Sequence, residues 1–200
     1  MENSEHKDFL GAKIGMWLFL FTEIILFGGL FLLYSVGLSK HAEDFHKAGQ
    51  ELDVLIGTIN TLVLITSSFF IALSITTLRL GKKKITVFLV GLTILSAIVF
   101  LINKYFEWTA KISHGIYPDS KHLLELPQGE ISFYNLYYTM TGLHAVHVLI
   151  GVIILSIVCL LIVKNRITGN NFIVLENSAL YWHLVDLIWI FLYPLFYLIA

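Results

Sequence analysis

Five ionisable side chains lie inside long apolar stretches of this sequence: Glu23, His144, His147, His183 and Asp186. A carboxylate in such a stretch costs about 2.5–3.5 kcal/mol at the centre of a membrane helix, so these groups should face protein or water. Their available chemistries are proton handling and, for the imidazoles, binding of haem or copper. His144 and His147 are i, i+3 neighbours, as are His183 and Asp186, so each pair shares one face of a helix.

Metal binding is the less favoured of these chemistries. A haem-copper centre needs several imidazoles from several helices. The other histidines fall in polar segments rather than in apolar ones: His6, His41, His46, His114 and His122. Cys159 is the only cysteine, so a binuclear copper centre has no thiolate pair. We therefore expect no metal site, no cofactor and no catalytic residue in this chain.

Glu23 is about ten residues beyond Lys13, which is on the order of 15 Å along a helix and close to the membrane midplane. Such a carboxylate can handle protons, anchor another subunit or fix helix packing. Because one carboxylate makes no relay, packing and anchoring are favoured. Its natural partner is His147 or His144, which we place at a similar depth. For the histidines, hydrogen bonds across helices are the favoured interpretation.

The elements that carry these residues are membrane-spanning helices. The sequence is 57% hydrophobic and 14% charged, which exceeds the apolar share of about 45–50% that is typical of soluble domains. Its net charge of −1 says nothing by itself about partners, and we expect no nucleic-acid partner. We predict an all-α integral membrane protein, a single domain over 1–200 with a bundle of five transmembrane helices. The predicted spans are about 14–38, 54–78, 85–107, 133–163 and 178–199.

The basic residues predict how this bundle lies in the membrane. Of the 13 Lys and Arg residues, 8 lie before the first predicted span or in the second and fourth connections of a chain that alternates sides. The positive-inside rule then places the N-terminus inside and the C-terminus outside. Trp17 and Trp182 should lie near the inner interface, and Trp108 and Tyr197 near the outer one.

Lys104 and Glu107 close the third predicted span and are i, i+3 neighbours. Lys104 should extend toward the lipid headgroups at the outer interface. The pair could be a salt bridge, a lipid-headgroup site or a docking point, and a plain interfacial pair is favoured. The residues predicted to lie at an interface, in contact with lipid or another subunit, are Lys104, Glu107, Trp108, Trp17 and Trp182.

Four stretches together resemble subunit III of the haem-copper respiratory oxidases, the cytochrome c oxidases and their quinol-oxidising relatives. They are GMWLFLFTEIILFGGLF, NTLVLITSS, FYNLYYTMTGLHAVHVLIG and YWHLVDLIWIFLY. Their order and spacing also match, over nearly the whole chain. Longer members of that family carry two more helices at the N-terminus, so the resemblance is to the short five-helix bacterial form. The matched polar positions are Glu23, Glu107, His144, His147, His183 and Asp186.

The resemblance implies an accessory subunit of a proton-pumping terminal oxidase in aerobic respiration, located in the bacterial plasma membrane. It would pack directly beside the catalytic subunit I, near subunit II and other respiratory chains, with haem and copper held by those partners. It would stabilise subunit I, support proton uptake and hold phospholipid in a cleft between helix groups. The complex would reduce O2 to water, with cytochrome c or quinol as electron donor.

Three other functions remain open. A self-contained proton channel or transporter could use the buried ionisable residues, although the chain shows no inverted repeat and no broken helix pair. A small membrane cytochrome would be recognised by its absorption spectrum. An accessory subunit of a related nitric oxide reductase would be distinguished by its neighbouring subunits.

Overall fold

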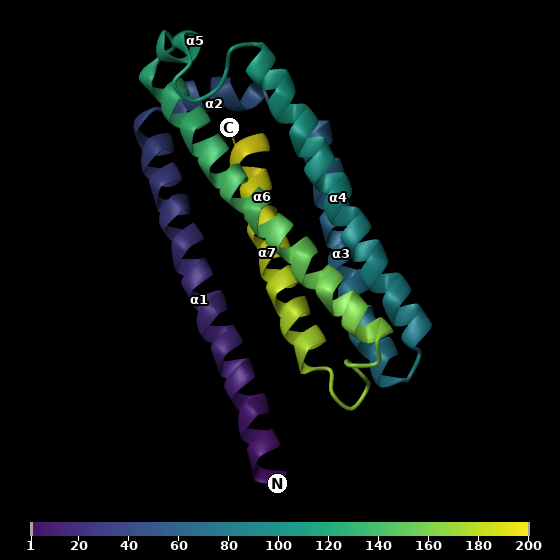
Figure 1. Ribbon diagram of the computed structural model, residues 1–200. Helices are drawn as coiled ribbons and strands as arrows, with labels where there is room; N and C mark the ends of the chain where they lie inside the picture. Colours follow the sequence, from purple (N-terminus) through teal and green to yellow (C-terminus); the bar gives the residue numbers. More distant parts are fainter. Residues whose placement is uncertain (1, 200) are drawn as a thin grey trace.

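The computed structural model describes the backbone of residues 2–199 and the side chains of residues 10–199. The described chain is helical apart from its connections and one isolated bridge between Thr168 and Asn171. Figure 1 shows the helices in chain order: α1 (Glu2–Lys40), α2 (Ala42–Gln50), α3 (Val54–Arg79), α4 (Lys83–Ser113), α5 (Lys121–Leu124), α6 (Gln128–Val163) and α7 (Ile173–Tyr197). Five of them, α1, α3, α4, α6 and α7, are long and apolar enough to cross a membrane.

The long helices extend beyond the predicted spans into the polar connections. Helix α4 continues to Ser113, past the predicted end at 107, and α6 begins at Gln128 rather than at 133. The connection after α1 also contains the short helix α2. Apolar runs identify only the part of a helix at membrane depth. Charges that suit helix ends, Glu130 in the first turn of α6 and Lys111 in the last turn of α4, allow the helices to continue.

Local signals set the helix ends on both sides of the bundle. Asp53 is the N-cap of α3, where its Oδ1 accepts hydrogen bonds from the backbone N–H groups of Leu55 and Ile56. Gly81 adopts φ +73° in the tight turn between α3 and α4, a conformation that glycine accepts without strain. At the end of α6, Lys83 Nζ donates to the carbonyl oxygen of Val163. The turn thus joins α3 to α4, and the lysine contact joins the start of α4 to the end of α6.

The helices pack around α6 and α7, as Figure 1 shows. Helices α3 and α4 form an antiparallel hairpin, α3 contacts α7, and α4 contacts α6. At the centre, a Cβ added to Gly151 of α6 would lie 2.6 Å from the indole of Trp182 in α7, so only glycine permits this close approach. The buried apolar side chains form one cluster across the bundle.

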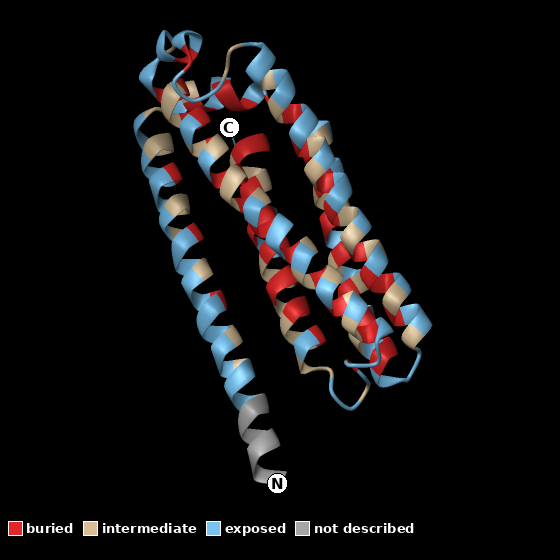
Figure 2. Ribbon diagram, viewed as in Figure 1, coloured by how far each residue is buried: buried red, intermediate tan, exposed pale blue. Residues whose placement is uncertain are grey.

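Helix α1 is the least covered of the five. In its most apolar window 11% of the residues are buried, against 56% in that of α7 (Figure 2). Polar contacts hold it at several levels. Lys13 pairs with Glu176 of α7 at 3.3 Å, and the Tyr34 hydroxyl donates to the carbonyl of Leu195. A third contact, from Glu23, belongs to the candidate site below.

The two ends of the bundle differ in character. The N-terminus and the α3–α4 and α6–α7 connections lie at one end, and α2 and α5 lie at the other, here called the α2–α5 end (Figure 1). The α3–α4 turn is basic, with Lys82, Lys83 and Lys84 in sequence. The α2–α5 end carries the carboxylates of α2 and of the segment that joins it to α3.

Candidate functional site

Glu23 of α1 and His147 of α6 form a hydrogen-bonded pair, with 2.9 Å between Oε2 and Nε2. His147 Nδ1 lies 2.8 Å from the carbonyl oxygen of Leu143, which can only accept, so Nδ1 carries a proton. One further proton then lies between Glu23 and Nε2, on the carboxyl group or on the imidazole. The pair can therefore hold one exchangeable proton, and it ties α1 to α6.

His144 has a different environment from His147, although both belong to α6. Its ring is fully buried between Phe100 of α4 and Trp189 of α7, with ring centroids 5.5 and 5.3 Å away. Neither ring nitrogen has a hydrogen-bond partner within the described part of the chain. Of the two partners predicted for Glu23, the structure brings His147 to it, because His147 faces α1 and His144 faces the bundle core.

His183 and Asp186 both contact α3. His183 Nδ1 lies 2.6 Å from the hydroxyl oxygen of Ser68. Asp186 is buried, and its Oδ2 accepts a long hydrogen bond of 3.5 Å from Ser67 Oγ. The indole N–H of Trp182 donates to the same Ser67 oxygen at 3.0 Å. The last-helix pair therefore lies at the contact of α7 with α3.

The predicted ionisable residues do not gather at one point. Glu23 and His147 lie between α1 and α6, whereas His183 and Asp186 lie against α3. Among the residues that the structure describes, no group of three or more His, Cys, Asp or Glu side chains could hold a metal ion. The arrangement offers two separate polar contacts between helices, each with groups that can bind or release a proton.

Lys104 and Glu107 form a salt bridge inside the bundle, with 3.1 Å between Nζ and Oε2. They are only 2% and 6% exposed. Tyr137 of α6 and Tyr197 of α7 contact both ions: each hydroxyl lies 2.9–3.1 Å from Nζ and donates to Glu107 Oε1 at 2.5 Å. The ammonium also lies 4.8–5.9 Å from the centroids of four aromatic rings, those of Trp108, Tyr137, Trp189 and Tyr197.

This geometry corrects three of the interfacial placements, those of Lys104, Glu107 and Trp182. Lys104 does not extend to headgroups, because a carboxylate and two tyrosines satisfy its ammonium inside the protein. Trp182 is 0% exposed, because Ser67 accepts its indole N–H within the bundle. Trp108 is half-buried, 5.7 Å from the ring of Tyr138. Trp17 is 60% exposed on α1.

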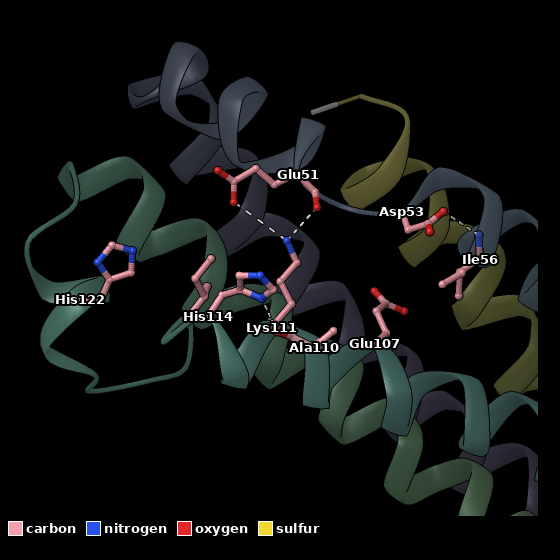
Figure 3. Close-up of a pocket in the computed structure, with 9 residues that line it drawn as sticks. Glu51, Asp53, Ile56, Glu107, Ala110, Lys111, His114 and His122 are labelled. Carbon is pink, nitrogen blue, oxygen red and sulfur yellow. Dashed lines mark hydrogen bonds and ion pairs between the residues drawn. The ribbon is translucent and has the colours of Figure 1, made fainter.

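A cavity of about 640 Å³ opens beside this ion pair at the α2–α5 end (Figure 3). Glu107 lies at its edge, next to Lys111, whose ammonium donates to the backbone carbonyl of Glu51 at 2.7 Å. The Glu51 carboxylate accepts from the Tyr134 hydroxyl at 2.5 Å. The other lining residues come from the start of α3, the end of α4 and the segment around α5: Asp53, Ile56, Ala110, His114, Ile116 and His122.

Sequence reasoning missed the partners rather than the charges. Tyr197 was predicted to lie near the outer interface, and Tyr137 and Ser67 were not singled out as partners. Lys111 and Glu51, which line the cavity, were not singled out. Lys111 and Tyr197 could have been noticed as polar side chains in the last turns of α4 and α7. The partner of such a residue can be predicted only when the register between the helices is known.

Comparison with known proteins identifies the family. Residues 3–200 match the family model of cytochrome c oxidase subunit III. The chain is 30% identical over 197 residues to a protein named cytochrome c oxidase subunit 3 from Thermostichus vulcanus, covering 98% of this chain and 90% of the relative. It is 32% identical over 192 residues to a probable quinol oxidase subunit 3 from Staphylococcus haemolyticus, covering 94% and 89%.

A third relative joins two subunits in one polypeptide. The chain is 29% identical over 205 residues to a haem-copper oxidase subunit I+III from Aeropyrum pernix, covering 98% of this chain and 24% of that protein. The family match spans all five of the long apolar helices. The chain therefore belongs to the cytochrome c oxidase subunit III family, and it is a multi-pass bacterial membrane subunit of a haem-copper oxidase.

Proposed function

We propose that this chain is an accessory subunit without a redox centre in a proton-pumping terminal oxidase. It packs directly beside the catalytic subunit I, which with subunit II holds the haem and copper and reduces O2 to water. It stabilises subunit I and supports proton uptake, with its own N-terminus on the cytoplasmic side. That orientation is supported by the basic α3–α4 turn, which lies at the same end as the N-terminus.

The observation that carries the proposal is the uncovered apolar surface of α1. Trp17, Leu18 and Phe21 are each at least 60% exposed. Gly11, Gly15, Gly28 and Gly29 have open space where a side chain would be. Small residues on a membrane helix allow another helix to approach closely. Together with a relative in which subunits I and III share one chain, this surface supports direct packing against subunit I.

Glu23 acts first as an anchor in this proposal. Few apolar residues of α1 are buried within the chain, so its hydrogen bond to His147 carries a large share of the specificity of α1 docking. The proton that the pair holds could also exchange during turnover. We place one acyl chain of the phospholipid expected from the family along the apolar groove of about 310 Å³ between α1 and α7, which is lined by residues that include Phe27, Phe31 and Ile188.

Affinity purification tests the accessory role. An affinity-tagged chain is purified from its host in mild detergent, and a reduced-minus-oxidised spectrum is recorded on the same sample. We expect a large haem-copper subunit to co-purify, and the haem signal to disappear when that subunit is removed. Oxidase assays with cytochrome c and with quinol then identify the electron donor. A chain that purifies alone and without haem contradicts the proposal.

A proton channel or transporter is the second candidate, because Glu23 and His147 hold a proton at membrane depth and Asp186 is a buried carboxylate. The substitution Asp186→Asn separates the two functions. If Asp186 serves packing, the complex assembles and still pumps protons. Assembly with complete loss of pumping favours a transport role. Proton flux across the membrane of vesicles that contain only this chain would independently favour the transport role.

A further inference from the structure

An apolar groove lies next to the cavity at the α2–α5 end. The groove, about 290 Å³, lies between α3 and α4 and is lined by Ile56, Ile59, Asn103 and Phe106. Ile56 also lines the cavity, so the two spaces adjoin. Ile59 and Phe106 are exposed on the outside of the bundle. The polar cavity and the apolar groove therefore follow one another along α3 and α4.

Helix α4 supplies a continuous stripe to both spaces. Asn103, Glu107, Lys111 and His114 are spaced by three or four residues, so they follow one face of the helix. From Lys111 to Asn103 is eight residues, or about 12 Å along the axis. The stripe changes from charged at Lys111 and Glu107 to an amide at Asn103, and Phe106 and Ile59 supply the apolar walls of the groove. This gradient matches an amphiphile that lies parallel to the helices.

The charges of the cavity favour a ligand with a positive group. Glu51, Asp53 and Glu107 line the cavity, and the only lysine or arginine that lines it is Lys111. Lys104, inside the bundle, neutralises the charge of Glu107. The cavity then has the two carboxylates of Glu51 and Asp53 and the one ammonium of Lys111. Figure 3 shows Lys111 between Glu51 and Glu107 on one side of the space. An ammonium group can therefore lie among carboxylates while an attached anionic group contacts Lys111.

The amide pair at the groove fits the next part of such a ligand. Asn103 is half-buried, and its Nδ2 donates to Asn60 Oδ1 at 2.8 Å. Asn60 is fully buried, and its own Nδ2 has no partner within the described residues. A buried amide nitrogen without an acceptor is costly. Of the two amides, Asn103 lines the groove one turn from Glu107, where the ester oxygens of a phospholipid would lie.

We propose that the cavity and groove bind a phospholipid with a primary-amine headgroup, of the phosphatidylethanolamine class. Its ammonium lies between Glu51 and Asp53, its phosphate lies beside Lys111, and one acyl chain follows Ile59 and Phe106. This site is on the α3–α4 side of the bundle, away from the groove between α1 and α7. The inference rests on the membrane location of the chain and does not depend on the accessory role.

Native mass spectrometry tests the site. The tagged complex is reconstituted in nanodiscs of equal dioleoyl-phosphatidylethanolamine and dioleoyl-phosphatidylglycerol, extracted in mild detergent, and its bound lipids are counted. Asp53→Asn removes a charge but keeps an N-cap for α3. Lys111→Gln removes the phosphate contact, and Ile59→Trp fills the groove. Leu62→Trp, on an exposed position of α3 that does not line the groove, is the matched control.

We expect the wild type to retain phosphatidylethanolamine over phosphatidylglycerol by at least about fivefold. Each of the three site variants should reduce this preference severalfold, and the control should keep it. Equal retention of both lipids, or the same lipid pattern in all variants, overturns the proposal. So does a partner polypeptide cross-linked to the cavity in place of lipid. Co-purification of subunit I is scored on the same samples, so failure of the lipid site and failure of the accessory role are distinguishable.

Discussion

The buried pair of Lys104 and Glu107 allows a sharp test of how this bundle holds charge. The substitution Glu107→Gln removes the carboxylate charge but keeps an acceptor for Tyr137 and Tyr197. It leaves the Lys104 ammonium 2% exposed and without a counter-charge. Removing one partner of a buried ion pair costs about 3–5 kcal/mol, mostly because the other charge stays buried. Lys104→Met should cost a similar amount for the reciprocal reason.

The double substitution should cost far less than the sum of the two. With both charges gone, the remaining losses are the weakened tyrosine hydrogen bonds, about 1 kcal/mol each. Two single losses of about 3–5 kcal/mol sum to about 6–10 kcal/mol, whereas the double variant should lose no more than about 3 kcal/mol. The expected coupling between Lys104 and Glu107 is therefore at least about 3 kcal/mol.

The wild type, the two single variants and the double variant form a double-mutant cycle. The free energy of unfolding of each purified protein is measured in mixed micelles. Lys13→Met with Glu176→Gln is a control cycle, because that pair is nearly as close, at 3.3 Å, but its side chains are 36% and 23% exposed. Its coupling should be much smaller, since exposed ammonium groups are screened. If the losses at Lys104 and Glu107 simply add, the reasoning is wrong. The charges would then be held independently, for example by solvent from the adjoining cavity.

Three further outcomes follow from single contacts. Glu23→Ala should destabilise the chain by about 1–3 kcal/mol and weaken its retention in the complex, because a buried imidazole loses its partner; unchanged melting and retention would contradict this. Gly151→Ala should cost about 1–3 kcal/mol by overpacking against Trp182, whereas Gly91→Ala, with open space around it, should be neutral or stabilising in the same unfolding assay. A hydrogen bond to a carboxylate of α6 raises the pKa of Lys47, so the difference in melting temperature between wild type and Lys47→Met should persist up to pH 10.5 and shrink only as the pH rises further through the folded pKa.

The sequence was sufficient to predict the five membrane helices, because a run of about 20 apolar residues has few alternatives in a membrane. It was also sufficient to predict that Glu23 needs a partner on another helix. It could not select between His144 and His147, since both lie near the same depth. The choice depends on the rotation of α6 about its axis, which Gly151 and Trp182 set by their close contact.

The same limitation explains the misplaced aromatic and basic residues. A tryptophan or lysine near a helix end is expected at the interface because water and headgroups can satisfy its polar atoms there. Trp182 and Lys104 are instead satisfied by Ser67 and Glu107, whose positions are visible only once α3, α4 and α7 are packed. An interfacial propensity is a statement about an isolated helix, and partners on neighbouring helices override it.

Helix α1 shows the opposite case, in which the helix is correctly predicted but its surroundings are incomplete. Three of its polar side chains, Lys13, Glu23 and Tyr34, find partners on α6 or α7. Its apolar side chains remain mostly exposed. In a membrane, apolar exposure costs little, so the polar contacts alone can fix the position of α1 within the chain. The exposed surface is then free to be selected for contact with another subunit, and substitutions there should alter assembly of the oxidase before they alter the stability of this chain.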